Sequence, residues 1–242
     1  FDRLESPGSS GWGNAHNGDV CHNVQVPPFR CPSSALKKWG HGYPNVHIQL
    51  CTYVGMSGAV DGLDPDCPET RVNSGGSETN CCSGGMASAG GVLFPHSDVT
   101  FAYVTDGTSN TAAISEQSDF IKTLDGTKVD WGAGHTHGWL IGSHSAAPPP
   151  HYGVGGDARH FNVVTIRYPI NQKEGWPDSP GNCGAVGVCQ NTGNNIPLTS
   201  THPGGVNVAL CDGSVRFLSE TVPMYVLSRL VTRDDGQVLD QF

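Results

Sequence analysis

The sequence of 242 residues lacks the features of several large classes of protein. It has no run of eighteen consecutive apolar residues, so no transmembrane helix is expected. Thirteen basic against 22 acidic residues give a formal net charge of -9, which argues against nucleic acid as a partner because no basic surplus can neutralise phosphates. Charged residues make up only 14% of the chain, whereas 33 glycines and 17 prolines make it rich in turns. This composition favours β-structure.

Sequence motifs of the common enzyme classes are also missing. The chain has no G-x-S-x-G turn, no P-loop, no dinucleotide-binding glycine pattern and no H-E-x-x-H zinc motif. His202 and Asp212 would lie toward opposite ends of one strand of roughly ten residues, at about 3.3 Å per residue, which is too far apart for a catalytic dyad. We therefore expect a protein that is not an enzyme and needs no cofactor.

Nine cysteines without a C-x2-C spacing favour an exported protein in an oxidising environment, extracellular or at the cell surface. The chain opens with Phe1-Asp2-Arg3, which predicts a processed or trimmed, soluble chain. Because nine is odd, at least one thiol is free or pairs with another chain, and Cys211 in an expected strand is the candidate. The candidates for disulfides are three local pairs, Cys21 with Cys31, Cys51 with Cys67 and Cys183 with Cys189, and the adjacent Cys81 and Cys82, which need two different partners.

The chain is expected to form a single domain over residues 1–242. Residues 1–30 predict an extended N-terminal arm, and residues 61–91 and 132–160 predict long loops, the first too polar to build a core and held by disulfides. Alternation of apolar and polar residues predicts strands near residues 46–54, 111–116 and 161–171, with Val164, Ile166 and Tyr168 on one face. A hairpin is expected over residues 202–219 and a helix over residues 222–234, which Pro223 begins.

The hairpin has the strongest local signal. Asp212-Gly213 between two apolar runs predicts a two-residue type I′ turn. That turn would pair Leu210 with Val215 and place four apolar side chains on one face of the hairpin: Val208, Leu210, Val215 and Phe217.

Two segments offer candidate metal ligands. The oxygens around Asp106 and Asn110 could hold a structural calcium ion, although they lack the acidic spacing of an EF-hand and capping of the backbone is the alternative. His135 and His137 would share one face of a strand and could begin a zinc or copper site, but no third ligand follows at a diagnostic spacing.

Several blocks of sequence resemble a known family. "TDGTSNTAAISE", "FNVVTIRYPIN", "NTGNNIPLTSTHPGG", "HPGGVNVALCDGSVRFLSE" and "LVTRDDGQV" are similar, in this order, to recurring blocks of the large domain-of-unknown-function family of planctomycete-type bacteria. Members of that family carry a prepilin-type N-terminal segment and an H-x9-DG signature near the C-terminus. The matching signature positions are Asp106, Gly107, Asn110, Glu116, His202, Gly205, Asp212 and Gly213.

The resemblance implies a pseudopilin-like fold of the α+β class, mostly β: an antiparallel sheet with long disulfide-stapled loops and a short C-terminal helix, carried on a long N-terminal helix. That helix, the family's route to the membrane, is absent from this sequence. We expect a structural, non-enzymatic subunit of an extracellular or cell-surface homopolymer, with itself as partner.

Two other functions remain open. A module that binds carbohydrate or another surface component could use exposed aromatic side chains, although packing in the core is their alternative role. A metalloenzyme built on the histidines of the loop at residues 132–160 is the third possible function. The aromatic candidates are Trp131, Trp139, Tyr152 and Trp176.

Overall fold

The computed structural model describes residues 3–5, 14–41, 45–73, 84–134, 137–143, 147–150, 160–178, 183, 186–190, 193–237 and 239. Its elements in chain order are α1 (Ala15–Cys21), η2 (Pro27–Phe29), β1 (Trp39–His41), β2 (His47–Gln49), β3 (Tyr53–Ala59), η3 (Phe101–Tyr103), β4 (Ala112–Glu116), β5 (Ile121–Lys122), β6 (Lys128–Val129), β7 (Val163–Ile166), β8 (Gly205–Leu210), β9 (Val215–Ser219) and α2 (Met224–Val231).

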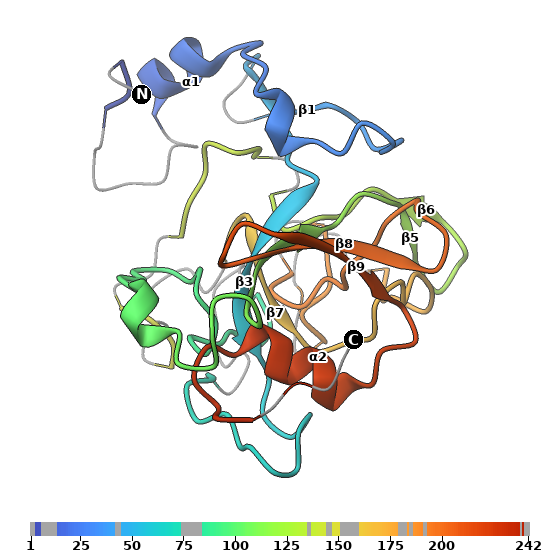
Figure 1. Ribbon diagram of the computed structural model, residues 1–242. Helices are drawn as coiled ribbons and strands as arrows, with labels where there is room; N and C mark the ends of the chain where they lie inside the picture. The colour runs from blue at the N-terminus through green and yellow to red at the C-terminus, as the bar shows by residue number, and fades with distance from the viewer. Residues whose placement is uncertain are drawn as a thin grey trace.

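A five-stranded sheet in the order β7-β3-β4-β8-β9 forms the centre of the molecule (Figure 1). Four of its strands pair antiparallel, and β7 at one edge pairs parallel with β3. β1 with β2 and β5 with β6 form two small separate sheets. The predicted fold class, α+β and mostly β, is confirmed, and the parallel pair is the departure from an antiparallel sheet.

The main core lies on the face of the sheet that α2 covers. Leu227, Leu230 and Val231 of α2 are at most 1% exposed and belong to one core cluster with apolar side chains of all five strands. Each such side chain contributes about 1.5–3 kcal/mol by leaving water. The predicted helix is confirmed, and it is shorter than expected because it ends at Val231, before Asp234-Asp235-Gly236.

The expected half-buried strand over residues 46–54 is wrong in its bounds. The chain forms β2, breaks, and then forms β3, which is buried along both faces except at its first residue. Residues 84–92 cover part of β3, where the Gly91 N–H donates to the Ser57 carbonyl and Ala87 and Ser88 are fully buried. The expectation that residues 61–91 form a loop too polar to build a core is therefore wrong for this part.

The hairpin of β8 and β9 forms, but in a register one residue away from the predicted one. Val208 pairs with Arg216 and Ala209 with Val215, and the Gly213 N–H donates to the Leu210 carbonyl. Gly213 has φ +85, so the loop has three residues with a left-handed glycine at its end, and a two-residue type I′ turn is excluded. A slip of one residue turns every side chain of a strand over, so Val215 faces away from the core.

The segment 161–171 contains the short strand β7. Val164 and Ile166 both lie in the main core, in agreement with their predicted common face. Tyr168 lies beyond the strand and packs edge-on against Trp176 in a second cluster, so its predicted place on the same face is wrong. The predicted strand at residues 111–116 is confirmed as β4.

The described part of residues 1–30 contains helical elements where an extended arm was predicted. Asn14 caps α1 by accepting a hydrogen bond from the Asn17 N–H at 3.0 Å, and η2 follows. Cys21 packs with Val46 and Ile48 in a third, small cluster. These elements form the upper lobe of Figure 1, from which β3 runs into the body.

Among the described cysteines, Cys183 and Cys189 form a disulfide, as predicted, with an S–S distance of 1.97 Å. The predicted pairs Cys21–Cys31 and Cys51–Cys67 are wrong, because all four thiols are free, as is Cys211. Cys81 and Cys82 lie outside the described residues. The described part of residues 61–91 is held instead by ion pairs such as Arg229–Asp64 at 2.5 Å and Arg71–Glu69 at 2.8 Å.

Candidate functional site

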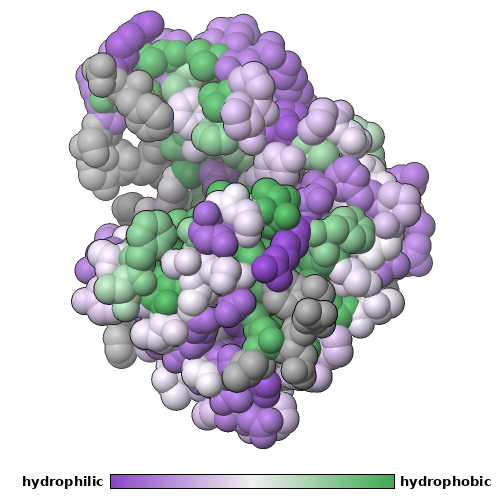
Figure 2. All heavy atoms as spheres, viewed as in Figure 1, coloured by the Kyte–Doolittle hydropathy of each residue, from purple (hydrophilic) through white to green (hydrophobic). Residues whose placement is uncertain are grey.

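The outer face of the sheet, opposite α2, carries an apolar groove of about 830 Å³. Residues of all five strands form its floor, and Phe29, Leu93 and Trp139 form its walls. None of the described residues that line it carries a charge. Figure 2 shows the notch between the upper lobe and the body, with hydrophobic residues on the body beside it.

Large apolar side chains continue this face into solvent. Ile114 is 40% exposed, Val215 66% and Phe217 50%. The last two result from the hairpin register, which puts Val215 opposite Ala209 and Phe217 opposite Asn207 on the outer face. A contiguous exposed apolar surface of this kind is uncommon on isolated globular proteins and marks a contact surface.

A second exposed apolar element is η3. Phe101 is 75% exposed and Tyr103 61% exposed, on a single 3-10 turn. Neither residue lines the groove. Among the described residues, the η3 turn is therefore an exposed apolar element that does not belong to the groove.

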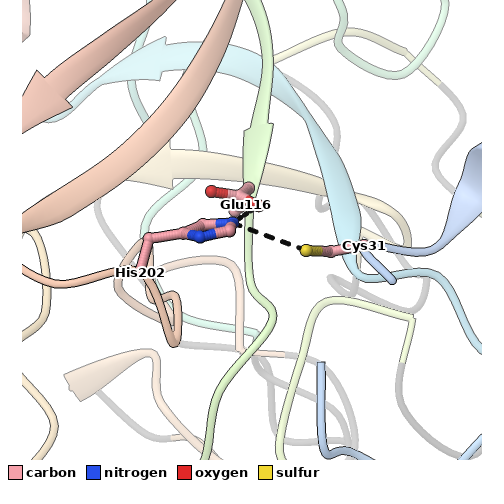
Figure 3. Close-up of side chains that lie close together, drawn as sticks. All are labelled: Cys31, Glu116 and His202. Atoms are coloured by element: carbon pink, nitrogen blue, oxygen red, sulfur yellow. Dashed lines mark hydrogen bonds and ion pairs between the residues drawn. The ribbon is translucent and has the colours of Figure 1, made fainter. Parts of the chain in front are cut away.

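Three side chains from distant parts of the chain meet at one edge of the groove region: Cys31, Glu116 and His202. Their ligand atoms all lie within 4.8 Å of one another. Figure 3 shows the His202 ring reaching toward Cys31, with Glu116 beside the same edge of the ring.

Local structure holds each of the three in place. Cys31 follows η2, and its N–H donates to the Thr52 hydroxyl at 2.7 Å. Glu116 is the last residue of β4 and lies opposite Tyr53 of β3. His202 precedes β8 in a turn in which its N–H donates to the Ser200 hydroxyl at 3.0 Å.

The Glu116 carboxylate is fully buried, and only one of its two oxygens accepts hydrogen bonds from the described residues. Its Oε2 accepts hydrogen bonds from the backbone N–H and the side-chain amide of Asn207, at 2.7 and 3.3 Å. Its Oε1 accepts no hydrogen bond from the described residues and lies 3.4 Å from Nε2 of His202. The same Nε2 lies 3.6 Å from Sγ of Cys31.

This arrangement differs from a thiol-based catalytic triad. In a triad, one ring nitrogen of the histidine faces the nucleophile and the other faces the carboxylate. Here both the thiol of Cys31 and the carboxylate of Glu116 face the same nitrogen of His202. The three groups therefore converge on one point and do not form a relay.

Two neighbouring groups are held in their neutral forms. Burial, and then the proximity of Cys31 and Glu116, raise the pKa of Tyr53 to about 12. Burial also raises the pKa of the Cys51 thiol to about 12, although Arg30 opposes the shift. Cys51, which lines the groove, is therefore a poor nucleophile at neutral pH.

The signature positions Asp106, Gly107 and Asn110 organise the end of the chain. Both carboxylate oxygens of Asp106 accept backbone N–H groups, of Asp235 at 2.7 Å and Gly236 at 2.9 Å, and the Asn110 amide donates to the Asp106 carbonyl. Burial, and the proximity of Asp106, raise the pKa of Asp235 to about 6. Capping of the backbone is thus the observed role of Asp106, and a calcium ion stays a prediction.

The remaining signature positions belong to the hairpin. Asp212 accepts hydrogen bonds from the N–H and hydroxyl of Ser214, at 2.9 and 2.7 Å. A Cβ at Gly205 would overlap the Leu218 carbonyl oxygen on β9. These residues close and pair the two strands, and β8 separates Asp212 from His202, in agreement with the expectation that the two form no dyad.

The other predicted candidates are two histidines and four aromatic residues. His135 and Tyr152 lie outside the described residues, and His137 is buried against Phe161. Trp131 and Trp176 are 7% and 2% exposed and pack in the second core cluster, whereas Trp139 lines the groove. Neither His137 nor Asp106 belongs to the donor cluster found in the described residues.

Sequence reasoning missed the cluster. It assigned Cys31 to a disulfide and, as a candidate for chemistry, paired His202 only with Asp212. Glu116 and His202 were singled out as signature positions of a family, but 85 residues separate them and only the pairing of β4 with β8 brings them together.

Comparison with models of known protein families gives a match. A family model described as "Protein of unknown function (DUF1559)" matches residues 5–224. No curated protein and no solved structure matches the chain. None of the described helices is long and apolar enough to cross a membrane.

Proposed function

This chain belongs to the DUF1559 family, and from that premise we propose that it is a pilin-like, non-enzymatic structural subunit of a homopolymer outside the cell or at its surface. The uncovered apolar face of the five-stranded sheet is the observation that carries this proposal. The disulfide between Cys183 and Cys189 is in keeping with an oxidising compartment.

A second copy of the same chain is the occupant that fits the groove. The groove has no charged lining among the described residues, so it offers a basic or acidic partner no ion pair. Each copy carries a formal net charge of -9, so copies repel at long range and association must come from apolar contact. Salt would therefore strengthen self-association, whereas it weakens the binding of an oppositely charged partner.

The exposed turn η3 supplies the complementary surface. Phe101 and Tyr103 project from it, and they are not part of the groove. Contact between two different surfaces of one chain is heterologous, and it gives an open polymer where the rotation between successive copies does not close a ring. We assign the η3 turn of one copy to the groove of the next.

Carbohydrate binding is less well supported. Trp131 and Trp176 are buried in the core and present no ring face to a sugar. Trp139 alone among the described aromatic candidates lines the groove, and its ring packs against Phe29 with centroids 6.1 Å apart.

The experiment uses the whole chain, unreduced, with one charge added to either surface. Phe101→Asp alters the turn and Val215→Asp alters the groove, and each should prevent polymers, seen by sedimentation and electron microscopy. Loss of one such apolar contact weakens association by about 10- to 100-fold. Leu124→Asp is the charge-matched control, because Leu124 is 72% exposed and belongs neither to the groove nor to the η3 turn. This variant should assemble like the parent chain.

A mixture of the two defective variants separates this proposal from other contacts. Phe101→Asp keeps an intact groove and Val215→Asp keeps an intact turn, so the mixture should form one-to-one dimers and nothing larger. Raising salt from about 0.1 M to about 1 M shortens the Debye length from about 10 to about 3 Å and should lengthen polymers of the parent chain. Single particles of the parent chain under all these conditions, or full polymers of either variant, would overturn the proposal.

A further inference from the structure

Cys31, Glu116 and His202 offer a thiol, a carboxylate and an imidazole, which together match the ligands that zinc takes in proteins. The buried Oε1 of Glu116 accepts no hydrogen bond from the described residues and points into the cluster. Burying a carboxylate oxygen without a partner is costly. A cation between the three groups would remove that cost. We propose that these three residues bind one Zn²⁺ ion.

The two distances from His202 Nε2 to the other ligand atoms fit this assignment. Zinc bonds are about 2.3 Å to sulfur, about 2.0–2.1 Å to nitrogen and about 2.0–2.2 Å to oxygen, so tetrahedral geometry places nitrogen about 3.6 Å from sulfur and about 3.4 Å from oxygen. The separations from His202 Nε2 are 3.6 Å to Cys31 Sγ and 3.4 Å to Glu116 Oε1. The second is long for a direct hydrogen bond to a carboxylate, which is usually about 2.7–2.9 Å.

The surroundings of the cluster provide supporting contacts and a route for the ion. Asn207 donates two hydrogen bonds to Oε2 of Glu116, which fixes the carboxylate and leaves Oε1 for the metal. Glu116 is fully buried, but the His202 side chain is 30% exposed, so the ion enters from the histidine side and its fourth position faces solvent.

The bound ion would join three segments that are far apart in sequence. Cys31 belongs to the N-terminal segment, Glu116 to the middle of the sheet and His202 to the turn before the hairpin. The described contacts of the segment after η2 to the body include single hydrogen bonds, such as that from the Ser34 hydroxyl to the Ser118 carbonyl. Because the unfolded chain has no preformed site, zinc binding would stabilise the fold and hold the N-terminal segment against the sheet.

The test uses the full chain, freed of metal with a chelator under mild conditions that keep the disulfide, and titrated with Co²⁺ and Zn²⁺. Co²⁺ should produce a thiolate-to-cobalt charge-transfer absorption that saturates at one ion per chain, and Zn²⁺ should abolish it. Cys31→Ser, Glu116→Gln and His202→Asn should each weaken Zn²⁺ binding by at least about 100-fold, since loss of a supporting residue alone costs 10- to 100-fold.

Cys211→Ser is the matched control, because Cys211 is also a free, partly buried thiol but lies at the far end of β8. It should leave the cobalt spectrum unchanged. A measurement on the unaltered chain covers the case in which a ligand variant fails to fold: Zn²⁺ should slow alkylation of Cys31 by iodoacetamide and leave that of Cys211 unchanged. Absence of a charge-transfer band, a band that persists in Cys31→Ser, or equal alkylation of Cys31 with and without Zn²⁺ would overturn the proposal.

Discussion

The carboxyl group of Asp235 makes the stability of the fold depend on pH. Its pKa is raised to about 6, first by burial and then by the nearby Asp106, against about 3.9 in an unfolded chain. Between these values the folded chain keeps a proton that the unfolded chain has lost. The free energy of unfolding therefore includes a contribution that is fully present below about pH 4 and is lost as the pH rises through about 6.

The size of this effect follows from the shift. Two pKa units correspond to about 3 kcal/mol at 1.36 kcal/mol per unit. Because Asp235 is only partly buried, solvent screening reduces this to about 1–2 kcal/mol. Asp235→Asn imitates the protonated carboxyl: its side-chain oxygen can still accept the Gln237 N–H, a hydrogen bond of 2.7 Å in the parent chain.

The variant should be more stable than the parent chain by about 1–2 kcal/mol at pH 8 and equally stable at pH 4, as measured by urea unfolding across this range. Asp234→Asn is the control of opposite sign, because Asp234 pairs with Arg71 at 2.9 Å and its neutralisation should destabilise the fold at pH 8. A difference between Asp235→Asn and parent that is the same at pH 4 and pH 8 would refute the reasoning.

Two further substitutions test the packing of the hairpin and the tie between α2 and the loop before β4. Gly205→Ala should lower the free energy of unfolding by about 2 kcal/mol, because its Cβ overlaps the Leu218 carbonyl. Gly142→Ala is the control, because a Cβ there meets no other atom, and it should change the free energy of unfolding by less than about 0.5 kcal/mol. Equal effects of the two substitutions would contradict this packing. Arg229→Leu should cost about 3–5 kcal/mol, since it leaves the carboxylate of Asp64, 2% exposed, without its partner. Adding Asp64→Asn should restore more than half of the loss, and no restoration in thermal melts would show that lost packing, not charge, was responsible.

Local sequence patterns were sufficient to predict those elements whose own residues show a clear periodicity or turn motif. The strand β4, the helix α2 and the presence of the β8–β9 hairpin all follow from short-range periodicity and turn residues. The hairpin register did not follow, because Asp-Gly is compatible with both a two-residue and a three-residue loop. The sequence therefore did not predict the exposed apolar face to which Val215 belongs.

The cysteines show a different limit. Cys183 and Cys189 are close in sequence and do pair. The same argument from closeness in sequence failed for Cys31. Spacing along the chain does not report the strand pairing that places Glu116 beside Cys31. Family resemblance marked Glu116 and His202, but it could not say that they touch.

The sequence by itself determined the class of fold, its C-terminal helix and hairpin, and the family, because these depend on composition, on periodicity and on residues close together in the chain. Tertiary structure decided which face of β9 is exposed and which possible metal ligands lie close together. The apolar groove is built by five strands from four separate parts of the chain, and Cys31 meets His202 across 171 residues. Such long-range contacts arise from pairing and packing of the whole sheet, and no local pattern encodes them.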